Sequence, residues 1–273
     1  VRMLEALIPQ LGDHTAESLG GGDICRAYRI ETATGRYFAK TPLRADPYLF
    51  AAEEWGLRAL AAVVPGLTPH VIGVDADWLV LEWVEEAPPS QPAARELGHC
   101  LAQLHAAPQQ AFGVGPEHAR IGSLPMPSGR YDRWPQMYAA LRLEPLVDGD
   151  LPNCRAVVES LRDEPEWAGP PEPASLLHGD LWSGNVLWTD AAPVLVDPAC
   201  HVGHRETDLA MLALFGTPHL ADIIAAYQEV YPLAPGWQDR VGLHQLWPLL
   251  VHHRLFAGGY GQRAEQIARE YVR

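Results

Sequence analysis

The sequence predicts an α+β fold with two lobes: a small antiparallel-sheet lobe with one key helix, and a larger, mostly helical lobe. Strand-like runs between Gly turns fill most of the first lobe, whereas helical periodicity dominates the second. Between them lies the polar, Pro-rich stretch EEAPPS (85–90), which is the best candidate for a hinge. We therefore expect the small lobe to span residues 1–85 and the large lobe residues 86–273.

The small lobe is expected to hold a hairpin, a helix and a second pair of strands. The stretch GGGDICRAYRIETATGRYFAK (20–40) has a Gly turn and two strand-like runs joined at a Thr-Gly turn. DPYLFAAEEWGLRALAAVV (46–64) follows helical spacing, with Asp46 as the N-cap and Pro47 at the first helical position. HVIGVDADWLVLEWV (70–84) predicts two more strands.

The large lobe is expected to begin with the helix PAARELGHCLAQLHA, where Leu97, Leu101 and Leu104 fall on one stripe. A loop-rich stretch follows, and short strands surround LHGDLWSGNVLW (177–188). The further helices are expected at about 132–144, at about 150–163, and from about Thr207 to the end.

Composition limits the classes of function. A formal charge of −14 argues against nucleic-acid binding, which needs many Lys and Arg contacts to phosphate. No run approaches the ~18 apolar residues of a membrane helix, and no signal segment is evident. The cysteines form no CxxC pair, as expected in a reducing compartment. We expect a cytoplasmic monomer that binds no membrane; Cys25 is either a redox-sensitive thiol or a plain strand cysteine.

One motif carries the chemistry. HGDLWSGN has the spacing H-x-D-x-x-x-x-N of the protein-kinase catalytic loop. Phosphoryl transfer needs an acceptor for the hydroxyl proton, a role suited to Asp180, and oxygen ligands for Mg²⁺, a role suited to Asn185. Gly179 and Gly184 permit the tight backbone that this loop requires. The alternative is a hairpin whose turn carries Asp and Asn for local reasons.

A second acidic group follows the motif at a fixed place. In VLWTDAAPVLVDPA two apolar strands flank a turn, and Asp197 ends the second strand. Kinases place the metal-binding Asp of their DFG segment there, although here the next two residues are Pro198 and Ala199. We expect Asp197 to bridge Mg²⁺ to the phosphates.

The small lobe supplies a cation and its partner. Lys40 ends the second hairpin strand, where its ammonium can reach nucleotide phosphates. Glu53 falls within the apolar stripe of the following helix, where an unpaired carboxylate would be costly. We therefore predict a Lys40–Glu53 pair, whereas Glu54 should pair with Arg58 in solvent.

Two backbone segments are expected to bind the rest of the nucleotide. The run Gly20-Gly21-Gly22-Asp23 precedes the hairpin and is expected to cover the phosphates. The residues just before the hinge, Glu82, Trp83 and Val84, are expected to offer backbone groups to an adenine edge.

Several segments together resemble the fructosamine kinases, relatives of aminoglycoside and choline kinases with a protein-kinase-like fold. The resemblance runs nearly end to end, and its most specific pieces are HGDLWSGN and DPACHVGHRETDLAM. It implies ATP- and Mg²⁺-dependent phosphorylation of a sugar hydroxyl, typically O3, on a glycated amine. Asp180 would be the base, Trp182 would stack on the sugar and His252 would line the acceptor pocket. A core Trp and a packing His are the alternatives.

Rival interpretations remain open at this point. Cys200, His201 and residues 248–255 depart from the family pattern near the acceptor side, so an aminoglycoside, choline or sugar kinase is the nearest rival. A nucleotide-binding module without turnover is a rival of another class. Asp208 either caps the helix that follows it or holds the catalytic-loop backbone. His201 and His204 with Glu206 could hold a metal, although the kinase interpretation explains them better.

Overall fold

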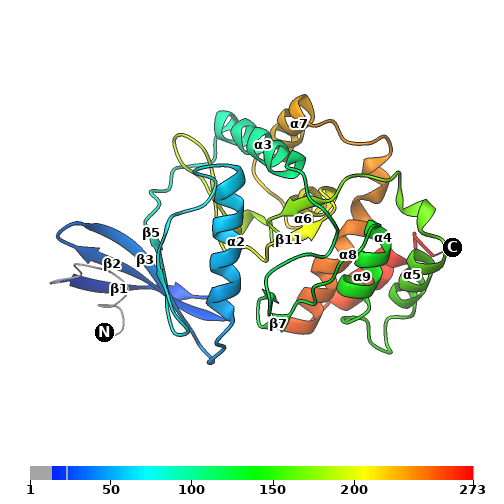
Figure 1. The fold of residues 1–273 in the computed structure, drawn as a ribbon, viewed down its shortest axis with the longest axis horizontal. Coiled ribbons are helices and arrows are strands. Elements are labelled where there is room, and N and C mark those ends of the chain that lie inside the picture. Colours follow the sequence, from blue (N-terminus) through cyan, green and yellow to red (C-terminus); the bar gives the residue numbers. More distant parts are fainter. Residues whose placement is uncertain (1–13, 23, 273) are drawn as a thin grey trace.

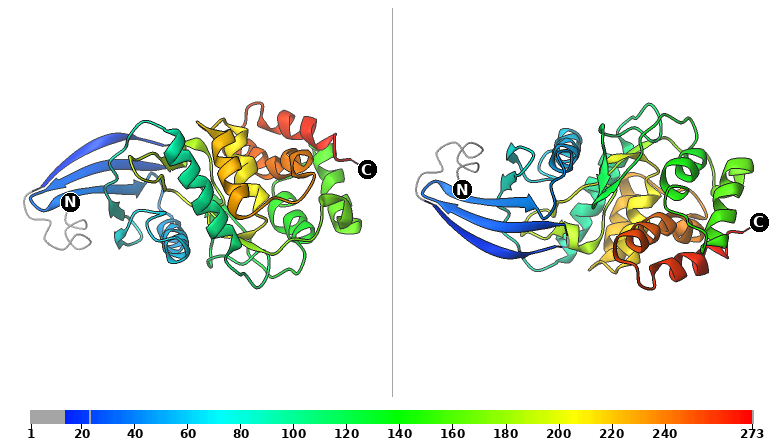
Figure 2. Two further views of the ribbon diagram at one scale, coloured as in Figure 1. Left: turned by 90° about the horizontal axis from the view of Figure 1, so that it is seen from above. Right: turned by 90° about the horizontal axis from the view of Figure 1, so that it is seen from below.

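The computed structural model describes residues 14–22 and 24–272 (Figure 1). A sheet with one helix lies at one end of the elongated molecule, and a larger body of helices lies at the other (Figure 2). The predicted two-lobed α+β fold is confirmed. Among the described residues, none of the helices combines the length and hydrophobicity that crossing a bilayer requires.

The sheet of the small lobe has five antiparallel strands within the described residues, in the order β1-β2-β3-β5-β4. The predicted hairpin and second strand pair are confirmed, but the sequence did not reveal β1. Its side chains from Thr15 to Gly20 are exposed, so no apolar alternation marks it as a strand. The strands are β1 (His14–Gly21), β2 (Cys25–Thr32), β3 (Gly35–Pro42), β4 (Val71–Val74) and β5 (Leu79–Glu82).

The helix α2 (Leu49–Val63) packs beside this sheet, on the side that faces the helical body (Figure 1). Phe50 and Leu57 form a buried cluster with Leu79 and Leu81 of β5. The predicted cap is wrong: the helix begins at Leu49, after Pro47, and Tyr48 stands at the N-cap position without a side-chain cap. Asp46 lies before that position: its Oδ1 accepts a hydrogen bond from Tyr48 N and its Oδ2 accepts one from Arg120, so the carboxylate holds the turn that precedes the helix and joins it to Arg120.

The helix α3 (Gln91–Ala106) follows the Pro-rich stretch. Ser90 caps it by accepting a hydrogen bond from Ala93 N. Within the Pro-rich stretch that joins the lobes, Ala87 N donates a hydrogen bond to Trp188 O. The predicted stripe of Leu97, Leu101 and Leu104 is fully buried. This stripe packs α3 into the core of the large lobe.

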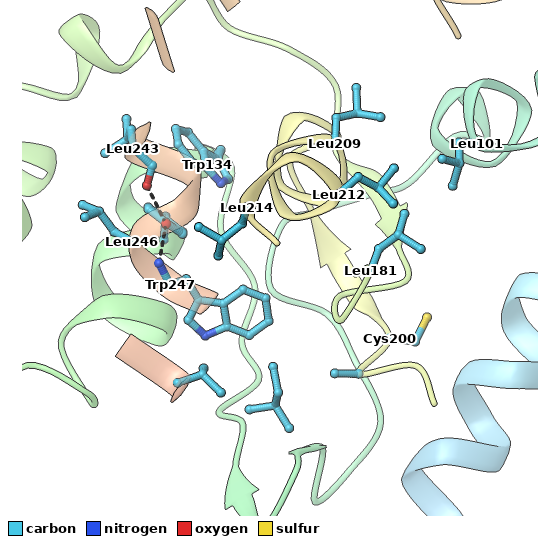
Figure 3. Close-up of a cluster of buried hydrophobic side chains, with 14 of the residues drawn as sticks. Leu101, Trp134, Leu181, Cys200, Leu209, Leu212, Leu214, Leu243, Leu246 and Trp247 are labelled. Atoms are coloured by element: carbon cyan, nitrogen blue, oxygen red, sulfur yellow. Dashed lines mark hydrogen bonds between the residues drawn. The ribbon is translucent and has the colours of Figure 1, made fainter. Parts of the chain in front are cut away.

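The core of the large lobe forms where α8 (Trp237–Phe256) crosses α6 (Glu206–Leu214), with Trp247 among the leucines of both helices (Figure 3). The Tyr138 hydroxyl donates to Leu243 O and accepts from Trp247 N, and it lies 3.3 Å from His244 O, the carbonyl that Pro248 leaves without an N–H partner within α8. The remaining helices are α4 (Trp134–Met137), the π-helix η1 (Tyr138–Leu143), α5 (Pro152–Asp163), the 3₁₀ helices η2 (Pro165–Ala168) and η3 (Ser183–Asn185), α6 (Glu206–Leu214), α7 (Leu220–Val230), α8 (Trp237–Phe256) and α9 (Tyr260–Ala268). The short strands are β6 (Arg120–Ile121), β7 (Leu124–Pro125), β8 (Ser175–Leu177), β9 (Val186–Leu187), β10 (Val194–Leu195) and β11 (His201–Gly203).

Candidate active site

The loop after β8 is held by one buried carboxylate. Asp208, in the first turn of α6, accepts hydrogen bonds from His178 N at 2.7 Å and from Gly179 N at 2.9 Å. The sequence left two roles open for Asp208, a helix cap or a support for the loop backbone. The structure shows that Asp208 supports the loop backbone. Gly179 has φ +82°, and a Cβ there would lie 2.1 Å from Ala199 O, so only glycine fits this crossing.

His178 links the loop to the strand that leads to Asp197, a role that the sequence analysis did not assign. Its Nδ1 accepts from Asp180 N at 3.2 Å, and its Nε2 donates to Val196 O at 2.9 Å. Burial lowers the pKa of His178, so the ring stays neutral and keeps this tautomer. His178 therefore fixes Asp180 relative to Asp197.

Asp180 and Asn185 meet as the motif predicts. Asn185 Nδ2 donates to Asp180 O at 2.8 Å and to Asp180 Oδ2 at 3.2 Å. Because its N–H groups are used in this way, the group that Asn185 can offer a ligand is its amide oxygen. Loss of solvation, and secondly the charge of Asp197, raises the pKa of Asp180 to about 7. Asp180 is thus a stronger base than an exposed aspartate.

The predicted pairing of Lys40 with Glu53 is confirmed. Lys40 Nζ lies 2.7 Å from Glu53 Oε2 and 2.6 Å from Asp197 Oδ1, and only 9% of the Lys40 and Glu53 side chains is exposed. Burial alone would lower the pKa of Lys40, but the two carboxylates outweigh it and raise this pKa. Burial also raises the pKa of Glu53 to about 7. The exposed Glu54–Arg58 pair forms as expected, at 2.9 Å.

These groups line one cavity of about 700 Å³ between the lobes. The predicted residues on its wall are Gly22, Lys40, Glu53, Asp180, Trp182, Asn185, Asp197 and His252. The predicted residues Gly20, Glu82, Trp83 and Val84 lie outside this lining, and Asp23 lies outside the described residues. Glu82 N already donates to His70 O, so that N–H is not available to an adenine.

One wall of the cavity is aromatic. Trp182 is 38% exposed, which excludes the core alternative, and its ring meets Phe215 edge-on at 6.3 Å between centroids. The ring centroid of His252 lies 4.9 Å from that of Phe215 and 5.1 Å from that of Tyr260. His252 Nδ1 donates to Pro248 O, so its Nε2 is the acceptor nitrogen. Phe215 and Tyr260 could not be found from the sequence, because they reach the wall only through the packing of α6, α8 and α9.

Two other candidates are structural. The thiol of Cys25 lies on the cavity wall, but burial raises its pKa to about 11, which disfavours the reactive thiolate. His204, Glu206 and His244 gather in the core without His201. Arg240 occupies both oxygens of Glu206, at 2.9 and 2.6 Å, so the carboxylate charge is already balanced and a cation there would add an unpaired charge.

Comparisons with known proteins show the family to which this sequence is similar. The model of the fructosamine kinase family matches residues 3–273. A "probable ketoamine kinase" of Lactiplantibacillus plantarum is 36% identical, over 97% of this chain and 97% of the relative. A chloroplastic protein-ribulosamine 3-kinase of Oryza sativa subsp. indica is 33% identical, over 94% of this chain and 78% of the relative.

Solved structures of related proteins have the same fold. A Thermobifida fusca protein assigned as a fructosamine-3-kinase superposes with a TM-score of 0.86 at 41% identity, covering 94% of this chain and 92% of the other. The aminoglycoside phosphotransferase APH(4)-Ia shares the fold, with a TM-score of 0.65 at 18% identity and 98% coverage of both chains. The chain therefore belongs to the fructosamine kinase family and is a phosphotransferase that acts on an alcohol group.

Proposed function

We propose that this protein transfers the γ-phosphoryl group of ATP to a sugar hydroxyl, O3, of a ketosamine on a glycated amine. The observation that carries the proposal is that Lys40, Asp180, Asn185 and Asp197 line one cavity, part of whose wall is aromatic. These four side chains suit phosphoryl transfer, and the aromatic side chains suit contact with the apolar face of a sugar ring.

In this proposal Asp180 is the general base. The attacking hydroxyl forms a bond to the γ-phosphorus, the bond from that phosphorus to the bridging oxygen of ADP breaks, and the hydroxyl proton passes to the Asp180 carboxylate. Asn185 and His178 hold this carboxylate in place through the side-chain and backbone hydrogen bonds described above. Lys40, oriented by Glu53, binds the phosphates.

The residues present fit a magnesium ion. The Asn185 amide oxygen and the Asp197 carboxylate are hard oxygen donors on the wall of one cavity, and the Asp197 side chain is 51% exposed. Asp197 holds a left-handed backbone conformation, φ 55°, that Asp tolerates. A bound Mg²⁺ would neutralise charge on the phosphates, while Asp197 and Asn185 would hold it.

The remainder of the nucleotide would lie along the small lobe. We infer that the backbone of Gly20, Gly21 and Gly22 covers the phosphates, as the sequence predicts. Trp83 and Val84 remain the candidates for the adenine edge, because the N–H of Glu82 is engaged within the sheet.

The substrate class can be tested with an acceptor panel. ADP release is measured with fructosyl-lysine, ribulosyl-lysine, an aminoglycoside, choline and free fructose. We expect the better ketosamine to exceed every other acceptor in kcat/KM by at least about tenfold, or ~1.4 kcal/mol. Heteronuclear NMR of the product should place phosphorus on O3. A higher kcat/KM for the aminoglycoside, choline or fructose would contradict the proposal, as would nucleotide binding without any phosphorylated product.

A glycine beneath Trp182 provides a sharper test of the aromatic wall. A Cβ at Gly184 would lie 2.3 Å from the Trp182 ring, so Gly184→Ala must displace the indole. We expect the KM for the ketosamine to rise about tenfold, the size of one lost stacking contact, while the KM for ATP stays the same. Gly149→Ala is the control, because nothing lies within 4 Å of a Cβ there. An unchanged acceptor KM in Gly184→Ala would remove Trp182 from the sugar site.

A further inference from the structure

A contact between the lobes joins the start of α2 to the strand β6. Arg120 Nε donates to Asp46 Oδ2 at 2.9 Å, and the two side chains are only 18% and 25% exposed. Arg120 Nη1 also donates to His118 O at 3.1 Å. The Tyr48 ring covers the pair on one side, 3.9 Å from the His118 ring and 5.7 Å from the Arg120 guanidinium carbon.

The two ends of this contact lead to opposite walls of the cavity. On one side, α2 carries Glu53, which holds Lys40. On the other side, the turn after β6 packs against α8, since a Cβ at Gly122 would lie 3.0 Å from Leu255 and 3.0 Å from Ile24. The same helix α8 carries His252. The Asp46–Arg120 pair therefore lies between the phosphate-binding side and the acceptor side.

We propose that Arg120 is a positioning residue, whose pairing with Asp46 clamps α2 to the β6–β7 hairpin and holds the two cavity walls at working distance. The role of the clamp in turnover rests on the proposed function, but the clamp itself is a property of the fold. Arg120 also lies on the cavity wall, but the proposed role acts through α2 and the hairpin and does not depend on a contact between its guanidinium and substrate.

The surroundings distinguish this pair from an ordinary surface ion pair, which contributes little. Partial burial, the additional bond to the His118 carbonyl and the covering Tyr48 ring restrict the guanidinium to one geometry. If the clamp raises the fraction of molecules with the lobes closed, the apparent affinity for a ligand that touches both lobes falls when the clamp is broken. The rate of a fully ligand-bound enzyme changes less, because the ligands themselves then hold the lobes together.

The test uses Asp46→Asn, Arg120→Gln and the double variant in the full chain. We expect each single variant to raise the KM for ATP about three- to tenfold and to change kcat less than about twofold. The double variant should be no worse than either single variant, since both remove the same interaction. Arg95→Gln is the matched control, because it breaks a pair with Glu229, at 2.8 Å, that joins α3 and α7 within one lobe.

Two measurements separate the clamp from the proposed reaction. Calorimetric titration with MgADP should show the same three- to tenfold loss of affinity, and small-angle X-ray scattering of the free variants should show a larger radius of gyration than wild type and Arg95→Gln. Wild-type values of KM, affinity and radius of gyration in both single variants would overturn the clamp, as would effects that multiply in the double variant. If the wild-type protein phosphorylates no ketosamine, the proposed function is refuted. The clamp is then tested by the MgADP titration and the scattering measurement, which do not depend on turnover.

Discussion

Replacing Asp180 with Asn is expected to lower kcat for ketosamine phosphorylation by about 10²- to 10⁴-fold, the usual contribution of a general base. Asn can still accept from Asn185 Nδ2 through its amide oxygen, so the loop should keep its conformation. What Asn lacks is a carboxylate able to accept the hydroxyl proton. Steady-state kinetics by ADP release would measure the loss, and calorimetry should show that MgATP affinity changes little.

Asp190→Asn is the matched control for this substitution. Asp190 is an exposed aspartate in the turn between β9 and β10, so its replacement should leave kcat within about twofold of wild type and alter stability by less than ~0.5 kcal/mol. Turnover by Asp180→Asn at a rate close to that of the control would exclude Asp180 as the base.

Lys40→Met is expected to reduce kcat/KM by at least about 10²-fold, the typical cost of removing one electrostatic group aimed at the reacting atoms. Met keeps much of the side-chain length but removes the cation that lies 2.7 Å from Glu53 and 2.6 Å from Asp197. The two carboxylates would then repel each other and the phosphates. Most of the loss should therefore be found in the KM for ATP, measured at saturating acceptor, with thermal unfolding as the check on folding.

Two neighbouring glutamates on α2 provide the comparison for this prediction. Glu53→Gln removes the buried partner of Lys40, whereas Glu54→Gln removes an exposed partner of Arg58. We expect the first to lower kcat/KM by about tenfold or more and the second to stay within about twofold of wild type. Equal effects of the two substitutions would show that the Lys40–Glu53 pair does not orient the phosphate-binding lysine.

The sequence predicted the local parts of the site because each depends on short-range geometry. The spacing between His178 and Asn185 and the two apolar strands before Asp197 are properties of one continuous segment. The Lys40–Glu53 pair could be inferred across two elements, since a carboxylate inside an apolar helical stripe requires a buried cation. Each of these features is present in the structure.

One error and one omission concern contacts that no local pattern reports. Asp46 was expected to be the N-cap of α2, but the helix begins at Leu49, and the Asp46 carboxylate accepts from Tyr48 N in the preceding turn and from Arg120, which lies 74 residues along the chain. The strand β1 has no apolar alternation and is defined by its pairing with β2. Arg120 is distant from Asp46 in sequence, whereas β1 pairs with the strand that follows it, and a local apolar pattern reports neither contact.

The sequence by itself indicated the fold class and the loop that carries Asp180 and Asn185, because turn residues, helical periodicity and motif spacing are encoded within segments of about 20 residues or fewer. It indicated the family through a resemblance that runs nearly the whole length of the chain. Only the tertiary structure decided that Asp208 holds the loop backbone, that Phe215 and Tyr260 complete the aromatic wall, and that Arg120 ties α2 to β6. These contacts arise when separate elements pack on one core, and burial then fixes the distances between their side chains.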